Sequence, residues 1–202
     1  MSDKELVQSH SVSTTSSVTT LPLRDRFPTF SSFCKAYSPD CISTVGKYKE
    51  RYLFGTSPSL VTLNKTYGDS SSIQLLMVHL SYVNEISFFS SRMSVQQIEY
   101  TATAMVQEFY YLKVSEIMLF LNGLMNGAYG SFYPTPVDIL TLLRERFIPY
   151  RNAAYAKREE EELQQKISDD AERFRNMTDE ERKRIQETKD RICRKLSIGT
   201  ED

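Results

Sequence analysis

Apolar residues recur every three or four positions through the middle of the chain, which is the spacing of an α-helix buried along one face. The clearest example follows Ser94 and Gln97, a capping-box sequence that starts a helix. Its apolar positions are Ile98, Ala102, Met105, Phe109 and Leu112. Strand-like alternation is weak throughout, the best case being residues 51–55. We therefore predict an all-α fold whose compact helical core covers residues 21–150.

Residues that start or stop helices locate the other core elements. The predicted starts are Pro28, Ser57-Pro58 with Ser57 as the N-cap, Asp69 or Ser70, Val114, and Thr135-Pro136. The helix after Ser70 is apolar on two faces, so we predict that it is the central helix of the core. The last core helix carries Val137, Leu140, Leu143 and Phe147. It also contains Pro149, which removes a backbone donor and is expected to kink or break the helix.

The two ends of the chain differ in composition from this core. Residues 9–20 are nearly all Ser, Thr and Val. Because such a segment buries too little apolar area to fold, we predict a disordered Ser/Thr-rich tail over residues 1–20. Residues 151–202 are predicted to form a charged helical extension, whose sparse apolar positions are typical of a weak coiled coil. These positions are Leu163, Ile167, Phe174, Ile185, Ile192 and Leu196.

Charge is segregated within this extension. Residues 157–172 hold three basic and seven acidic side chains, a net charge of −4. Residues 173–195 hold nine basic and five acidic side chains, a net charge of +4. A hairpin that folds the two halves onto each other pairs opposite charges, and so does an antiparallel dimer. Both arrangements stay open at this point.

Overall composition narrows the classes of function. The chain has 202 residues and a formal net charge of −1, so its surface as a whole does not attract DNA or a membrane. No stretch approaches the roughly 18 apolar residues of a membrane span. The first twenty residues lack the basic and apolar parts of a secretory signal, and three cysteines fit a reducing compartment. We therefore expect a cytoplasmic protein without membrane contact.

An inventory of reactive side chains yields no catalytic site. The chain has two histidines: His10 lies in the predicted tail, and His79 is interpreted as a core histidine held by a neighbour. Nucleophile elbows, Gly-rich phosphate loops and HExxH sequences do not occur. Cys34 and Cys41 have no nearby histidine and do not fit a zinc site, and the glutamates at 159–162 point around a solvated helix. We expect a non-enzymatic protein with no metal and no cofactor.

Basic side chains near the C-terminus give a nucleic-acid alternative. They are Arg182, Lys183, Lys189, Arg191, Arg194 and Lys195. Each can contact a phosphate, although acidic residues interleave with them as on an ordinary solvated helix. The helix after Lys113 is a weak recognition helix, because no Arg or Lys follows within it. A DNA-binding regulator that acts through the last helix is therefore an alternative function.

Residues 126–134 form an unusual aromatic segment between two apolar helices. Gly127 and Gly130 allow left-handed turns, and three aromatic side chains stand close together. These are Tyr129, Phe132 and Tyr133. They either fill part of the core or form an exposed protein-binding patch, since aromatic residues are common at the centres of interfaces. Both interpretations stay open.

Several elements between residues 94 and 151 share one further pattern. They are Gln97 at a helix start, Tyr111-Leu112-Lys113, the apolar helix to Leu124, the turn Gly127-Ala128-Tyr129-Gly130-Ser131-Phe132-Tyr133, and Tyr150-Arg151. In this pattern the segment resembles a family of small bacterial proteins of unknown function, common in phages and mobile elements of gut bacteria. The chain departs from that family at Met125 and Ala128, where members often carry basic residues. It also departs at Pro134, where many have glycine.

The resemblance implies an origin in a phage or mobile element. In layout alone, short helices before a charged tail are similar to phage helicase-loader and helicase-inhibitor modules. The leading hypothesis is a protein-binding adaptor, acting in DNA replication, whose partner-binding residues are Tyr129, Phe132, Tyr133 and Arg151. The missing basic residues argue against a nucleic-acid role for the turn. A self-associating structural or virion-packaged protein is the further alternative, and it leaves a virion location open.

Overall fold

The computed structural model describes residues 22–86, 92–130 and 135–198, without the side chains of residues 195–198. Within these residues all regular elements are helical, which confirms the predicted all-α fold. The predicted tail, residues 1–20, lies outside the described residues. The chain divides into two compact units, Met1–Leu140 and Thr141–Asp202. The division lies ten residues before the predicted boundary at Tyr150.

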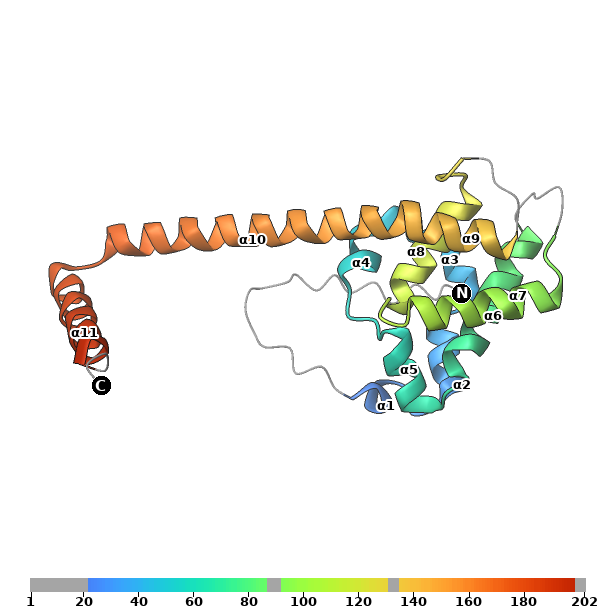
Figure 1. The fold of residues 1–202 in the computed structure, drawn as a ribbon, viewed down its shortest axis with the longest axis horizontal. Coiled ribbons are helices and arrows are strands. Elements are labelled where there is room, and N and C mark those ends of the chain that lie inside the picture. Colours follow the sequence, from blue (N-terminus) through green and yellow to red (C-terminus); the bar gives the residue numbers. More distant parts are fainter. Residues whose placement is uncertain (1–21, 87–91, 131–134, 199–202) are drawn as a thin grey trace, which may run out of the picture. The chain divides into compact units, whose positions relative to one another are not determined.

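The first unit consists of helices packed around α8 and α6: α3 and α4 pack on α8, α5 and α7 pack on α6, and α6 and α8 pack on each other (Figure 1). Its α-helices are α1 (Leu23–Arg26), α2 (Phe30–Ala36), α3 (Ile42–Val45), α4 (Lys49–Phe54), α5 (Leu60–Tyr67), α6 (Ser71–Ile86), α7 (Val95–Glu108) and α8 (Val114–Met125). Two 3-10 turns, Pro39–Cys41 and Gly46–Tyr48, join α2 to α3 and α3 to α4. Helix α9 (Pro136–Leu142) reaches the division between the units.

Helix α8 is the centre of this core. Ten of its twelve residues are buried, and α3, α4 and α6 all pack against it. The prediction that the helix after Ser70 is central is correct only in part: α5, α7 and α8 pack on α6, but eight of its sixteen residues are buried. Helix α6 leaves Val78 56% and Ile86 46% exposed, so only part of its apolar circumference is covered. Single exposed aliphatic residues are common on protein surfaces, and a sequence pattern does not distinguish them from core positions.

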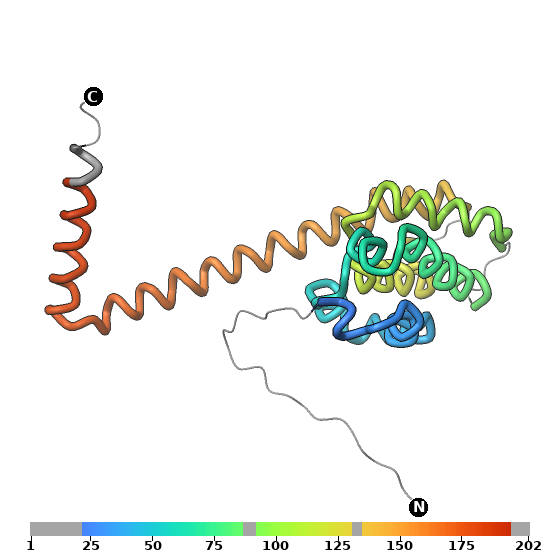
Figure 2. Tube along the Cα trace, turned by 90° about the horizontal axis from the view of Figure 1, so that it is seen from below, coloured from blue at the N-terminus to red at the C-terminus, as the bar shows by residue number. Residues whose placement is uncertain are grey.

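The remaining core helices lie on two sides of α6 and α8. In Figure 2 the blue helices α2 and α3 lie on one side and the yellow-green α7 on the other. The packing agrees, because α7 packs on α6, and α6 and α3 pack on α8. The predicted apolar stripe of α7 faces inward: all five of its positions, from Ile98 to Leu112, are buried. Its capping box is also present, since Ser94 and Gln97 exchange hydrogen bonds of 3.3 and 2.8 Å.

The start of α5 corrects one predicted cap. The helix begins at Leu60, and the Ser59 hydroxyl, not that of Ser57, accepts the Thr62 N–H at 3.3 Å. Pro58 favours an extended residue before it, and the neighbouring backbone pairs with a distant segment instead of turning. The Val114 N–H donates to the Pro58 carbonyl at 2.9 Å, and the Ser57 hydroxyl donates to Ser115 Oγ at 2.7 Å.

The predicted interruption at Pro149 takes an unexpected form. Residues Leu143–Phe147 form a π-helical turn, and α10 (Ile148–Asn176) continues directly from it through the proline. The wider turn before the proline makes room for its ring, which would clash with the preceding turn of a regular α-helix. The helix therefore changes type without breaking. On α9 the predicted inward Val137 is 70% exposed, and Ile139 is buried instead.

The second unit is dominated by α10 and α11 (Asp179–Ile198). Twelve basic and twelve acidic side chains between residues 157 and 195 make both helices strongly polar. Good helix formers fill them, which explains their length despite little burial. Exposed i, i+4 pairs such as Arg158–Glu162, at 2.8 Å, add small contributions.

Candidate functional site

The aromatic turn begins where α8 ends. Gly127 has φ of 68° and Gly130 has φ of 81°, so both take the left-handed conformations predicted for them. The Ala128 N–H donates to the Gly123 carbonyl at 2.9 Å, which folds the turn back onto the last turn of α8. This return directs the following aromatic residue toward the helix.

Tyr129 packs on the surface of α8. Its ring centroid lies 5.5 Å from that of the fully buried Phe120. The ring also covers Gly123 so closely that a Cβ atom there would lie 2.6 Å from Tyr129 Cε2. Tyr129 is half-buried, so it contributes to the core while keeping one edge in solvent. Phe132 and Tyr133, predicted to bind a partner with it, lie outside the described residues.

Arg151 lies on α10, in the second unit. Its guanidinium group is 4.5 Å from the ring centroid of Tyr155, one turn further along the same helix. Its Nη1 donates to Asn152 Oδ1 at 3.1 Å. These contacts hold the side chain along its own helix. Tyr129 and Arg151, which the sequence analysis grouped as one site, therefore belong to different units.

The described apolar positions of the C-terminal extension are exposed, and the side chain of Leu196 lies outside the described residues. The stripe consists of Leu163 (55% exposed), Ile167 (54%) and Phe174 (59%) on α10, and Ile185 (48%) and Ile192 (52%) on α11. The three α10 positions share one helical face, and so do the two α11 positions. Because every member is about half exposed, neither helix covers the stripe of the other. Of the two arrangements that charge segregation left open, the internal hairpin is not formed in the structure.

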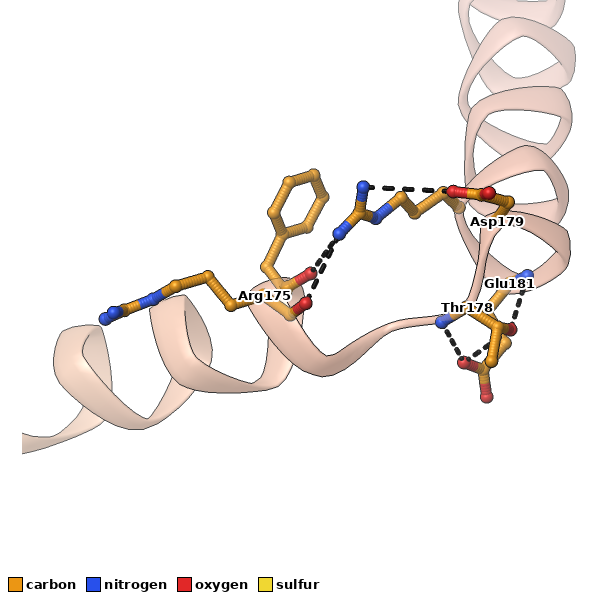
Figure 3. Close-up of polar contacts among 6 residues, drawn as sticks. Arg175, Thr178, Asp179 and Glu181 are labelled. Atoms are coloured by element: carbon orange, nitrogen blue, oxygen red, sulfur yellow. Dashed lines mark hydrogen bonds and ion pairs between the residues drawn. The ribbon is translucent and has the colours of Figure 1, made fainter.

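The connection between α10 and α11 is a hydrogen-bonded corner (Figure 3). Thr178 and Glu181 form a capping box at the start of α11: the Thr178 N–H donates to Glu181 Oε2 at 2.9 Å, and the Glu181 N–H donates to Thr178 Oγ1 at 3.4 Å. Hydrogen bonds from the backbone and then the side chain of Thr178 lower the pKa of Glu181 below its ordinary value. The carboxylate therefore stays charged at the positive end of the α11 dipole.

Arg182 links this corner to the end of α10. Its Nη2 donates to the carbonyl oxygens of Phe174 and Arg175, both at 3.3 Å, and its guanidinium group lies 5.3 Å from the Phe174 ring centroid. Its Nη1 also lies 4.0 Å from Asp179 Oδ1. Arg182 was predicted as a phosphate contact, but it caps the C-terminal carbonyls of α10. Sequence reasoning missed this role, although the Thr178 capping box places Arg182 in the first turn after the break.

The other predicted basic residues are spread around α11. Lys183, Lys189, Arg191 and Arg194 are exposed, and the side chain of Lys195 is not described. Positions 183, 191 and 194 share a face, whereas Lys189 lies beside the apolar stripe. The structure therefore brings Lys183, Arg191 and Arg194 to one face of α11, whereas Arg182 contacts the end of α10.

His79 is buried in the core, as interpreted from the sequence. It is 2% exposed, and its Nδ1 lies 2.8 Å from the Leu75 carbonyl oxygen, to which it donates one turn back along α6. Within the described residues its Nε2 has no hydrogen-bond partner. Burial lowers the pKa of His79, outweighing the opposite effect of the Leu75 and Tyr37 carbonyls. The imidazole is therefore neutral at pH 7 and closed to solvent.

Two negative findings concern the described part of the chain. No group of three His, Cys, Asp or Glu side chains there is placed to hold a metal ion. No helix among those residues combines the length and the apolar character that crossing a bilayer requires.

Comparison with known proteins gives no match to a protein-family model, a curated protein or a solved structure. The resemblance of residues 94–151 to a phage-associated family therefore stays an expectation from the sequence.

Proposed function

We propose that the protein is a non-enzymatic adaptor that holds a protein partner through the exposed stripe of α10 and α11. The supporting observation is that five large apolar side chains are each about half exposed, at helical spacing, on two otherwise charged helices. Exposed apolar rows of this kind mark interaction surfaces, and helix-on-helix docking is their usual mode. The partner surface that fits them is an amphipathic helix.

The aromatic turn has a supporting role in this proposal. The Tyr129 ring packs against Gly123 and Phe120, which holds it in place. The part of the ring that stays exposed can therefore add contact area for a partner. Arg151 is likewise steadied against Tyr155. An origin in a phage or mobile element and an action in DNA replication rest on the sequence resemblance, and a place in the cytoplasm rests on the composition of the chain.

Affinity capture tests the adaptor proposal. The tagged full-length protein is incubated with host lysate, with and without nuclease, and the captured proteins are identified by mass spectrometry. We expect a specific protein that stays bound after nuclease treatment. Capture that disappears with nuclease would instead support the DNA-binding alternative through Lys183, Arg191 and Arg194.

Self-association is a second candidate, favoured by the charge distribution. An antiparallel pair of chains sets the −4 segment, residues 157–172, against the +4 segment, residues 173–195. These segments are similar in length, about 24 and 34 Å as helices, so their charges overlap over most of the pairing. Sedimentation equilibrium at increasing protein concentration tests this candidate. A strict monomer at the highest concentration would contradict a self-associating structural or virion role.

A further inference from the structure

A cavity of about 540 Å³ opens on the first unit, far along the sequence from the C-terminal helices. Its lining comes from the ends of α1 and α2, from α3 and α4 with the turn between them, and from the first turns of α8. Ser115 and Met118 form its buried side, being 5% and 1% exposed. The volume lies within the range of about 300–1,000 Å³ that is common for small-ligand sites.

The charge around this cavity has one sign. Arg26 and Arg51 line it from α1 and α4, and none of the described residues that line it is acidic. Both arginines are exposed, and neither forms an ion pair with a described residue. Both lower the pKa of the same phenol, Tyr37, which lines the cavity with them. Two guanidinium groups without an acidic partner favour a bound anion, and guanidinium matches phosphate well.

Aromatic rings form much of the remaining wall. Tyr37, Tyr48 and Tyr52 line the cavity together with Phe27. The ring of Tyr37 is stacked on that of buried Phe33, with centroids 4.5 Å apart and an interplanar angle of 21°, so its position is fixed. Tyr48 is 58% exposed. Fixed and exposed tyrosine rings provide flat faces on which a planar ring can stack.

The phenol hydroxyls in the wall remain donors at neutral pH. Burial raises the pKa of Tyr37 and of Tyr52 above the ordinary tyrosine value, which outweighs the opposite effect of the nearby arginines. Neutral phenols donate hydrogen bonds to anionic or sugar oxygens. Thr44 adds a further hydroxyl to the lining.

We propose that this cavity binds a mononucleotide, with the phosphate at Arg26 and Arg51 and the base against the tyrosine rings. The volume of the cavity, the positive charge of its two arginines and its aromatic wall all fit a flat ring joined to a phosphate. The proposal is separate from the adaptor function, because every described residue of the cavity lining belongs to the first unit. Sequence reasoning missed it, since its residues are spread from Arg26 to Met118 and form no local motif.

Isothermal titration calorimetry on the full-length protein tests this proposal. Each of the four ribonucleoside 5′-monophosphates is titrated, alongside the matching nucleosides and inorganic phosphate. We expect one site per chain for at least one nucleotide, and weaker binding of its nucleoside and of phosphate alone. Arg26→Gln and Arg51→Gln should each reduce that affinity about tenfold or more without changing the melting temperature, since both side chains are exposed.

Lys47→Gln is the matched control. Lys47 is exposed on the turn between α3 and α4 but does not line the cavity, and its loss removes the same charge. Affinity should be nearly unchanged in this variant. Absence of saturable nucleotide binding would overturn the proposal. Equal binding of phosphate alone, or equal losses in the Lys47 and arginine variants, would overturn it as well, because each indicates unspecific attraction of anions.

Discussion

Buried polar groups in the first unit are held by neighbours in fixed positions. His79 donates to the Leu75 carbonyl, and Asn122 Nδ2 donates to the Ile42 carbonyl at 2.7 Å, which ties α8 to α3. These hydrogen bonds matter for stability mainly because a buried donor or acceptor without a partner destabilises the folded state. Gly46 fits this contact closely, since a Cβ atom there would lie 2.9 Å from Asn122 Oδ1. The polar side chains of His79 and Asn122 therefore help to fix the packing of the core and are shielded from solvent.

His79 makes stability depend on pH. The unfolded chain binds a proton at this histidine as the pH falls through about 6.5, while burial keeps the folded imidazole neutral to lower pH. The free energy of unfolding should therefore be highest well above that pH and fall as the pH drops from about 7.5 to about 5.5. Urea unfolding at both pH values measures the loss. His79→Gln should reduce the loss, and an equal loss in both proteins would contradict this explanation.

The contact between Tyr129 and Gly123 predicts strong coupling between two substitutions. Gly→Ala inside a helix ordinarily stabilises by about 1 kcal/mol. At position 123 the new methyl group meets the Tyr129 ring, so we expect no gain in the wild-type protein. In a Tyr129→Ala background the gain of about 1 kcal/mol should appear. Chemical unfolding of the wild type, the two single variants and the double variant measures this coupling. Additive effects would show that the Tyr129 ring does not rest on Gly123.

Tyr129→Ala by itself separates the two interpretations of the aromatic turn. A half-buried ring should contribute about 2 kcal/mol, roughly half of the loss for a fully buried aromatic residue. An unchanged melting temperature would mean that Tyr129 has no role in the core and is available for binding.

At the scale of elements, the sequence was informative where a cap and a periodic stripe coincide. The helix starting after Ser94 and the helix over residues 114–125 were predicted closely, because capping and burial point the same way. Which helix is the most deeply buried in the core was not predictable. Helices α6 and α8 are both strongly apolar, and only the packing of α3 and α4 decides that α8 is central. Likewise, Ser57 and Ser59 are equal as local signals until the pairing of Pro58 with Val114 selects Ser59.

The start of α8 depends on a buried carboxyl group. Glu116 is fully buried, and its Oε2 accepts the Lys113 N–H at 2.8 Å. Glu116→Ala removes this acceptor at a buried helix start, so we expect a loss of about 1–3 kcal/mol in the free energy of unfolding. Glu116→Gln keeps an acceptor oxygen and should lose clearly less. Denaturant unfolding of both variants tests the cap, and equal losses would point to the charge of Glu116 instead.

At the scale of the whole molecule, the sequence predicted which residues form the apolar stripe of α10 and α11 but not whether the stripe is covered. Positions such as Leu163 and Ile185 were identified from spacing. Whether the two halves of the extension cover each other depends on the corner at Thr178 and Arg182, which involves backbone carbonyls that a sequence pattern does not show. The nucleotide cavity was beyond sequence reasoning for a similar reason, since tertiary packing alone brings Arg26 and Arg51 to it.

Self-association through the segregated charges predicts a dependence on salt. If antiparallel chains pair residues 157–172 with 173–195, the dissociation constant should rise when salt is increased from about 0.05 M to about 0.5 M, because exposed charges are screened. Sedimentation equilibrium at both salt concentrations measures the change. Association that strengthens with salt would show that the apolar stripe alone drives it.

The most direct test of the adaptor proposal compares two neighbouring substitutions on α10 in quantitative affinity capture from host lysate. Ile167→Glu adds a charge within the stripe, and Ser168→Glu adds the same charge at an exposed position away from it. Both positions are exposed, so both variants should melt at the wild-type temperature. We predict that Ile167→Glu loses the captured partner and that Ser168→Glu retains it. Retention of the partner by both variants would contradict the claim that the stripe of α10 and α11 is the binding surface.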